Sequence, residues 1–389
     1  MIGAIVGDIA GSPYEFDNIK TTAFPLFGSH HGKRARPTDD SVMTLAVARA
    51  LLDAADDPAA LPAAAVRRMQ EFGRRYPRIG YGPAFYRWLF APAPKPYNSW
   101  GNGAAMRVSA CGWAARTLDE ALAFSDAVTG VTHNHPEGLK GARAVTAAIF
   151  LLRTGVPFEE IWKHITETYY PLDFYIDDIR TDYEFDVSCQ GSVPQALKAF
   201  SEADETTCGW SGVEHAVRNA VSIGGDSDTI AAIAGAVAEA RWGVPDDLRN
   251  KTLARLDDFQ RETVEAFEAR FGAPVPNRPW DIDGVFLTIV WWHNPRTRGN
   301  LPANIALCWE CEKIAEGILV QRNHDKYWQH ENIFRISLDD DPVVDGDTGD
   351  ITGDEIVRLK DFVRRNRDLI HAHWIGKKDS SVVFQLKFD

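Results

Sequence analysis

Apolar residues recur at helical spacing through most of the chain. After the acidic pair Asp39-Asp40, Val42, Leu45 and Leu52 share one face, and a second acidic motif further along is followed by the same spacing. A period of three to four residues is that of an amphipathic α-helix. The same pattern predicts further helices over 61–75, 103–116, 118–129, 137–153, 157–168, 209–221 and 251–271. We therefore expect an all-α domain up to about residue 272.

The pattern changes in a proline-rich stretch, residues 273–284. Proline stops a helix because it lacks an N–H group and clashes with the preceding turn. Beyond this stretch lie a tryptophan-rich apolar run (285–292), a second apolar segment (332–338), an amphipathic helix (356–370) and an alternating stretch with the period of a strand (382–388). The sequence predicts a mainly α protein, with a compact all-helical domain over residues 1–284 and a small α+β C-terminal unit over residues 285–389.

Composition narrows the class of protein. Of the 389 residues, 45% are apolar and 25% are charged, as in ordinary globular proteins, and no apolar run is long enough to span a membrane. The N-terminal segment lacks the features of a secretory signal, and five cysteines do not form a disulfide framework, so we expect a cytoplasmic protein. The net charge of -13 repels nucleic acid and anionic membranes, and we expect neither as a partner.

Two acidic motifs stand directly before predicted helices. The first is Thr38-Asp39-Asp40, and the second runs from Gly224 through Asp226, Ser227 and Asp228 to Thr229. Each motif alone also fits a helix N-cap, whose side-chain oxygen accepts a free backbone N–H. Together they offer four carboxylates and the hydroxyls of Thr38 and Thr229, which are hard oxygen donors that favour Mg²⁺ or Mn²⁺ over zinc. Clustered carboxylates would repel one another without a cation, so the pair of motifs predicts a site for divalent metal.

A glycine-rich loop, Gly101-Asn102-Gly103, precedes a predicted helix. Small residues let a phosphate approach free N–H groups at the positive end of a helix dipole. A plain turn and cap is the alternative.

Three other motifs carry less chemistry. Gly3, Gly7 and Gly11 are not followed by the residues of a P-loop, and close helix packing explains them better. The acidic loop 345–350 departs from a calcium loop at the glycine position, and the pair Cys308 and Cys311 favours free cysteines over zinc.

The motifs taken in order resemble the ADP-ribosylglycohydrolase family. The resemblance covers about residues 1–272 and rests on residues 7–15, on Thr38-Asp39-Asp40, on residues 101–107, on Thr132-His133 and on residues 224–229. Members of this family have an all-α fold around two metal ions and hydrolyse the bond between ADP-ribose and an acceptor.

The resemblance implies a role for each matching position. Glu15 matches a mobile glutamate near the scissile bond, although a lone glutamate is more often a solvated surface charge. His133 resembles a histidine near the diphosphate or distal ribose, whereas His135 fits a structural loop histidine. The implied metal ligands are Thr38, Asp39, Asp40, Asp226, Asp228 and Thr229, the implied catalytic residues are Glu15, Asp39 and Asp228, and the implied ADP-ribose pocket comprises Gly101, Asn102, Gly103, Met106, His133, Gly224 and Gly225.

These expectations add up to a hydrolase that uses two Mg²⁺ (or Mn²⁺) ions to remove ADP-ribose from modified protein side chains. Arginine is the favoured acceptor because the N-terminal motifs look most like those of bacterial members. Serine-linked ADP-ribose and O-acetyl-ADP-ribose are alternative substrates. A non-catalytic ADP-ribose-binding protein and a metal-dependent phosphoesterase are alternative functions on the same metal site.

Overall fold

The computed structural model describes residues 1–203, 211–272, 286–290, 305–309, 317–321, 333–337, 342–345 and 352–374. The chain divides into two compact units, Met1–Pro276 and Asn277–Asp389, and the division falls within residues 273–284. The acidic loop 346–350, Cys311 and the alternating stretch 382–388 lie outside the described residues.

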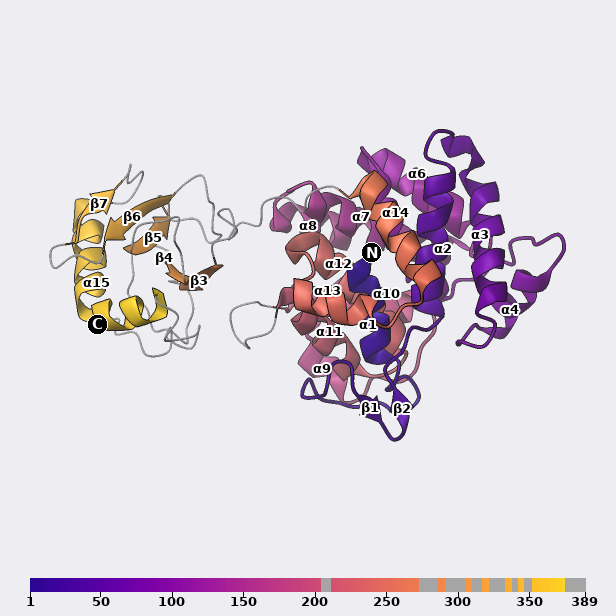
Figure 1. Cartoon of the computed structure of the whole chain (residues 1–389), viewed down its shortest axis with the longest axis horizontal. Helices are drawn as coiled ribbons and strands as arrows, with labels where there is room; N and C mark the ends of the chain where they lie inside the picture. Colours follow the sequence, from indigo (N-terminus) through magenta and orange to yellow (C-terminus); the bar gives the residue numbers. More distant parts are fainter. Residues whose placement is uncertain are drawn as a thin grey trace. The chain divides into compact units, whose positions relative to one another are not determined.

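The first unit is helical, which confirms the predicted fold class (Figure 1). Its α-helices are α1 (Ile2–Gly11), α2 (Asp39–Asp53), α3 (Leu61–Arg75), α4 (Pro83–Phe90), α5 (Ser109–Ala114), α6 (Leu118–Thr129), α7 (Pro136–Arg153), α8 (Phe158–Thr168), α9 (Ile176–Arg180), α10 (Cys189–Ser201), α11 (Gly212–Ile223), α12 (Ser227–Trp242), α13 (Asp246–Leu253) and α14 (Asp258–Phe271). Two 3-10 turns, η1 (Pro58–Ala60) and η2 (Asn102–Ala104), and a two-stranded hairpin, β1 (Ser29–His30) with β2 (Lys33–Arg34), complete it. Among the described residues, no helix combines the length and apolarity needed to cross a membrane.

Helices α1 and α12 form the centre of this unit and pack against each other (Figure 1). Every residue of α1 is buried. Added Cβ atoms would lie 2.1 Å from the Gly235 oxygen at Gly3, 2.0 Å from the Ala231 oxygen at Gly7 and 2.4 Å from the Asp228 Cα at Gly11. The glycines therefore let two backbones touch, as the sequence predicted, and this contact sets Asp8 of α1 beside the start of α12.

The N-terminus of α1 is capped from the far end of α12. The Glu239 carboxylate accepts hydrogen bonds from the backbone N–H groups of Ile2 (3.2 Å) and Gly3 (2.8 Å), and it pairs with the amino group of Met1. A carboxylate at this position satisfies N–H groups that have no partner within the helix and lies at the positive end of its dipole. The two central helices are thus fixed to each other at both ends.

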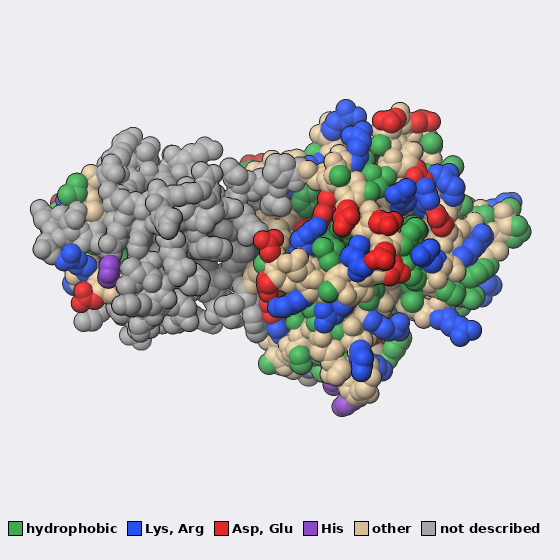
Figure 2. All heavy atoms as spheres, in the orientation of Figure 1, with side chains coloured by type: hydrophobic (Ala, Val, Ile, Leu, Met, Phe, Trp, Pro, Cys, Tyr) green, Lys and Arg blue, Asp and Glu red, His purple; other side chains and the backbone are tan. Residues whose placement is uncertain are grey.

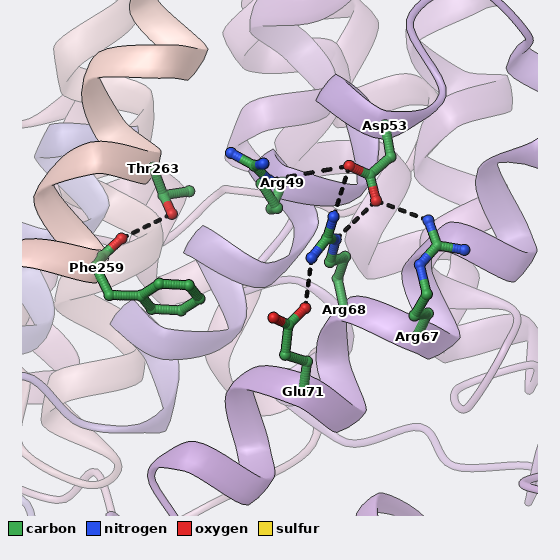
Figure 3. A network of polar contacts seen from close by, with 7 residues as sticks. All are labelled: Arg49, Asp53, Arg67, Arg68, Glu71, Phe259 and Thr263. Carbon is green, nitrogen blue, oxygen red and sulfur yellow. Dashed lines mark hydrogen bonds and ion pairs between the residues drawn. The ribbon is translucent and has the colours of Figure 1, made fainter.

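Helix α2 is joined to α3 by a group of charged side chains at its C-terminal end (Figure 3). Asp53 accepts from Arg68 Nε (2.7 Å) and Nη2 (2.9 Å), and Arg67 Nη2 also donates to it (2.7 Å). This fork-shaped contact fixes the far end of α2. The opposite end of α2 carries the first acidic motif.

Two predicted helices are wrong in extent. Residues 103–116 do not form one helix, because the Asn102 carbonyl accepts from the N–H groups of Ala105 (2.8 Å) and Met106 (3.0 Å), which closes a tight turn. The helix α5 begins only at Ser109. Residues 251–271 are the end of α13 and the whole of α14, since Asp257 and Gln260 form a capping box that starts a new helix. Helices α4, α9 and α10 and the β1–β2 hairpin were not predicted.

The second unit contains an antiparallel sheet with the order β3-β4-β5-β6-β7 and one long helix. The strands are β3 (Phe286–Val290), β4 (Ile305–Trp309), β5 (Gly317–Gln321), β6 (Ile333–Ser337) and β7 (Val344–Asp345), and the helix is α15 (Gly353–Trp374). β3, β6 and α15 coincide with predicted segments, whereas β4, β5 and β7 were not predicted. An α+β unit follows the helical one, as expected.

Charged side chains of both signs are interspersed over the face of the first unit seen in Figure 2. The negative net charge of the chain is therefore not gathered into one acidic patch on this face.

Candidate active site

A cavity of about 330 Å³ in the first unit is lined by residues from segments far apart in the sequence. Of the residues singled out in the sequence, those that line it are Glu15, Asp39, Asp40, Gly101, Asn102, Gly103, Met106, His133, Asp226, Asp228 and Thr229. Both acidic motifs, the glutamate and the glycine-rich loop therefore meet in one place.

Asp8, to which the sequence assigned no role, lies at the base of this arrangement and is fully buried. Its carboxylate accepts from Thr38 N (2.9 Å), Thr38 Oγ1 (2.6 Å) and Ser41 N (3.0 Å), and also from the Ser41 hydroxyl. Thr38 makes no side-chain cap of its own at the start of α2. The cap of this helix is therefore Asp8 from α1, which leaves Asp39 and Asp40 free for another task.

Two groups of carboxylate oxygens are close enough to hold cations. Oxygens of Asp8, Asp40 and Asp228 lie within 4.8 Å of one another, and so do oxygens of Glu15, Asp226 and Asp228. Asp228 belongs to both groups, which is the arrangement that a shared ligand between two metal ions requires. Asp40 Oδ1 is buried and has no hydrogen-bond partner, so it is free to bind a cation. The residues present fit divalent metal with oxygen ligands.

The other predicted ligands occupy the edges of these groups. The Thr38 hydroxyl bonds to Asp8, and Thr229 Oγ1 donates to Asp40 Oδ2 (3.2 Å). Asp39 lines the cavity next to Gly80, where an added Cβ would lie 2.5 Å from Asp39 Oδ1. The two hydroxyls orient carboxylates in this structure, and Asp39 stands at the cavity wall outside both groups.

Burial and mutual repulsion raise the pKa values of the carboxyl groups in the cluster. Burial is the largest cause for Asp39, Asp40 and Asp228, and the nearby acidic groups add to it. Burial, followed by Asp226 and Asp8, raises the pKa of Glu15 to about 7. Such a cluster holds protons or cations in preference to bare negative charge.

The glycine-rich loop is anchored by hydrogen bonds on both sides. Asn102 Nδ2 donates to Asp226 Oδ2 (2.7 Å) and to Ser192 Oγ (2.9 Å), and Asn102 N donates to the Val187 carbonyl (2.8 Å). The Asn102 amide thereby orients one carboxylate of the second acidic motif.

Backbone N–H groups of this loop are largely occupied. The N–H groups of Asn102, Ala104, Ala105 and Met106 all donate to backbone carbonyls. Four N–H groups of the loop are therefore used within the protein, as in the plain turn that the sequence left open beside the phosphate site.

His133 rests against the same loop, where an added Cβ at Gly103 would lie 3.4 Å from its Nε2. Arg107, which is fully buried, donates to Thr132 Oγ1 (2.6 Å), and this oxygen lies 2.7 Å from His133 Nδ1. Arg107 Nη2 also lies 3.4 Å from His133 Nδ1, and because arginine only donates, Nδ1 is the acceptor and the proton of the neutral imidazole is on Nε2. Burial, together with Arg107, holds the pKa of His133 well below its usual value. His133 thus presents an N–H donor to the loop.

The segment that carries Glu15 is fastened to the turn before α12. Asn18 Nδ2 donates to the Gly225 carbonyl (3.0 Å), Gly225 N donates back to Asn18 Oδ1 (2.7 Å), and Lys20 Nζ donates to the Ile223 carbonyl (2.7 Å). Gly224 and Gly225, with φ of 81° and 65°, form this turn and do not line the cavity. They place Asp226 at the cavity through the backbone.

Several lining residues were missed from the sequence. They are Gly80, Gly82, Pro83, Ala84, Phe85, Tyr97, Ser99, Arg107, Phe185 and Val187. Arg107 and Asp8 stand inside the motifs quoted above, so a role for each was within reach. The others lie in loops or in the unpredicted α4, where no local pattern marks them.

Comparisons with known proteins identify the family of this chain. A family profile described as ADP-ribosylglycohydrolase matches residues 1–277. The ADP-ribosylhydrolase ARH3 of Mus musculus is 24% identical over 338 aligned residues, which cover 69% of this chain and 87% of that protein. The ADP-ribosylhydrolase ARH3 of Homo sapiens is 25% identical over 314 aligned residues, covering 63% and 84%.

A solved structure described as an ADP-ribosylglycohydrolase-related protein complex has the same fold, with a TM-score of 0.51 at 21% identity. It covers 70% of this chain and 96% of that chain. The family match spans more than half of the chain, and the cavity lies within the matched residues. The chain belongs to the ADP-ribosylglycohydrolase family and is a glycosidase that acts on linkages to ADP-ribose.

Proposed function

We propose that this protein is a binuclear-metal-dependent hydrolase that releases ADP-ribose from modified protein side chains, with arginine as the first acceptor. The observation that carries the proposal is the cavity in which Glu15, both acidic motifs and the 101–103 loop meet. The proposed substrate is an ADP-ribosylated protein or a small ADP-ribose derivative.

The carboxylates of Asp40, Asp226 and Asp228, with Asp8 and Asp39 beside them, would hold two Mg²⁺ or Mn²⁺ ions. When bound, the ions supply Lewis acidity and hold the ribose hydroxyls and a water in place. Asp8 and Asn102 keep the ligands in position, because Asp8 fixes the start of α2 and the Asn102 amide fixes Asp226.

Glu15 is the proposed residue that moves a proton at the scissile bond. It lines the cavity beside Asp226 and Asp228, and no hydrogen bond in the described structure pins its carboxylate to a neighbouring side chain. His133 Nε2–H and the 101–103 loop are the proposed contacts for the polar groups of ADP-ribose. Hydrogen-bond donors such as His133 Nε2–H stabilise charge that develops on the substrate during hydrolysis.

An arginine acceptor suits the electrostatics of the cavity. Its guanidinium group is always charged, and such a cation favours the charged form of the carboxyl groups of Glu15 and Asp39, which line the cavity with raised pKa values. A serine acceptor or an acetyl ester brings no such charge, and these remain the alternatives.

The decisive experiment compares peptides that carry ADP-ribose on arginine or on serine, with O-acetyl-ADP-ribose as a third substrate. We expect Mg²⁺-dependent release of ADP-ribose, fastest from arginine and abolished by chelator and by Asp228→Ala. Faster release from serine would move the assignment to that linkage. Release that is indifferent to both chelator and Asp228→Ala would exclude the metal mechanism, and binding of ADP-ribose without turnover of any substrate would indicate a binding protein.

A second experiment addresses Glu15. Glu15→Gln keeps the size of the side chain but removes its ability to exchange a proton, so we expect kcat to fall about 100-fold or more. Glu265→Gln, which changes an exposed glutamate of α14, is the matched control and should leave kcat unchanged. Equal kcat values for the two variants would remove Glu15 from the mechanism.

A further inference from the structure

A second group of metal-ligand side chains lies on the segment between α1 and α2. Asp17 Oδ2 is 2.5 Å from His31 Nδ1 and 3.3 Å from His30 Nε2, and all three ligand atoms lie within 4.8 Å of one another. None of the three residues lines the candidate active-site cavity. The carboxylate and the His31 ring are accessible, with 38% and 73% of their side-chain surface exposed, whereas His30 is at 22%.

The hairpin turn brings the two histidine side chains to the same side of the backbone. His31 and Gly32 have φ of 46° and 84° and form the two-residue turn between β1 and β2, in which His30 pairs with Lys33. Neighbouring residues of an extended strand point to opposite sides. The positive φ of His31 cancels that alternation, so the two imidazoles stack with their centroids 4.1 Å apart and face the same carboxylate.

The inner histidine is held in place by packing. The Tyr14 ring lies 4.9 Å from the His30 ring, and Tyr14 itself is buried against Phe24 (5.1 Å). Asp17 is fixed from the other side, since its backbone N–H donates to the Tyr14 carbonyl (3.1 Å). Two of the three ligands are therefore positioned before any ion binds.

We propose that Asp17, His30 and His31 form a separate binding site for a transition metal ion of the Zn²⁺ class. Two imidazole nitrogens and one carboxylate oxygen are the donors that such ions prefer, in contrast to the all-oxygen cluster of the active site. Ligands about 2 Å from a tetrahedral zinc ion lie about 3.3 Å from one another. The separation of His30 and Asp17 already has this value, and the exposed His31 ring need only swing outward.

The ion would link two parts of the segment between α1 and α2, which carries Glu15. Asp17 stands near the beginning of this segment, two residues after Glu15. His30 and His31 belong to the later β1–β2 hairpin, which projects from the helical unit in Figure 1. A cross-link here shortens the free segment between α1 and α2. We expect the bound ion to protect the exposed Lys33 and Arg34 of β2 from trypsin.

Calorimetric titration of the full-length protein with Zn²⁺, in millimolar Mg²⁺, tests the site. The wild-type protein should bind one more equivalent of Zn²⁺ than His31→Gln or Asp17→Asn. Loss of an outer-sphere partner alone weakens metal binding by about 10- to 100-fold, so removal of a ligand should cost at least that. His164→Gln, on α8, is the matched control for the loss of one histidine and should retain the extra equivalent.

The variants leave the acidic cluster untouched, so Zn²⁺ bound at the active site is counted equally in all four proteins. The same stoichiometry and affinity in wild type, His31→Gln and Asp17→Asn would overturn the proposal. Tryptic cleavage after Lys33 and Arg34 is the second measurement, and Zn²⁺ should slow it in the wild-type protein and in His164→Gln only. Because neither measurement involves ADP-ribose, the outcome is independent of the proposed hydrolase function.

Discussion

The carboxylate of Asp8 lies between α1, to which it belongs, and the first turn of α2, where it accepts hydrogen bonds from Thr38 and Ser41. Four donors converge on one buried side chain, which is why it can remain there. The same bonds fix the backbone that presents Asp39 and Asp40 to the cavity. Stability and the geometry of the metal ligands therefore depend on one residue.

Asp8→Asn tests this dependence. An amide offers one acceptor oxygen and turns its NH₂ group towards donors, so we expect the free energy of unfolding in chelator to fall by about 2 kcal/mol. Mg²⁺ affinity, measured by calorimetry, should fall as well. Asp126→Asn removes a partly exposed carboxylate paired with Arg143 and should cost less than about 1 kcal/mol with no effect on Mg²⁺. Similar urea midpoints for the two variants would contradict the role assigned to Asp8.

At the scale of elements, the contact between α1 and α12 decides where the acidic residues go. The glycines of α1 bring its backbone against that of α12, and the direction of α1 then sets Asp8 next to Asp228 and Asp40. A wider spacing between the two helices would move Asp8 away from Asp228, the carboxylate that belongs to both groups of oxygens. The packing of α1 against α12 therefore also sets the positions of the carboxylates that would bind metal.

Gly7→Ala should therefore be severe although it adds one methyl group. The new Cβ would lie 2.0 Å from the Ala231 oxygen, and backbone cannot give way as a flexible side chain can. We expect a loss of at least ~2 kcal/mol in urea unfolding. The control is Gly82→Ala, where an added Cβ meets nothing within 4 Å, and this variant should unfold at the wild-type midpoint. A wild-type midpoint for Gly7→Ala would show that the helices are free to move apart.

At the scale of the whole molecule, the metal and the pH should act together on stability. The folded-state pKa values of Asp39, Asp40 and Asp228 are raised above their usual value, mainly by burial. The stability that these three carboxyl groups contribute to the metal-free protein is therefore fully present below the unfolded-state pKa of about 4 and is lost as the pH rises through the folded-state values. Bound cations take the place of those protons.

We expect the gain in Tm on adding Mg²⁺, relative to chelator, to grow between about pH 5 and about pH 8. Thermal unfolding followed by circular dichroism at each pH measures it. In Asp40→Asn/Asp228→Asn the gain should be small and nearly independent of pH. A gain in the wild-type protein that is constant or shrinks with pH would argue against carboxylates as the metal ligands.

The C-terminal unit offers a separate prediction about substrate choice. The cavity and its supporting helices lie within residues 1–276, so a chain without residues 285–389 should keep its activity on a modified peptide. If the second unit selects protein targets, activity on a modified whole protein should fall while activity on the peptide is retained. Equal losses on both substrates, measured as released ADP-ribose, would assign this unit to stability alone.

Residue patterns alone determined several of the helices and which residues carry charge. The spacing of apolar residues predicted α3, α6 and α7, and the two acidic motifs indicated a group of oxygen ligands. These features are local, since a helix and its cap are set by residues a few positions apart. The resemblance to a family then supplied Glu15 and His133, for which no local pattern was sufficient.

Only the tertiary structure decided which of these residues meet. Asp8 stands inside a motif quoted from the sequence, but only its hydrogen bonds with Thr38 and Ser41 show that it caps another helix. Arg107 acts on His133 through Thr132, and His30 meets Asp17 through a hairpin turn that was not predicted. Such contacts join residues distant in the chain, and they depend on how closely helices pack and how turns redirect side chains. Sequence spacing does not record either.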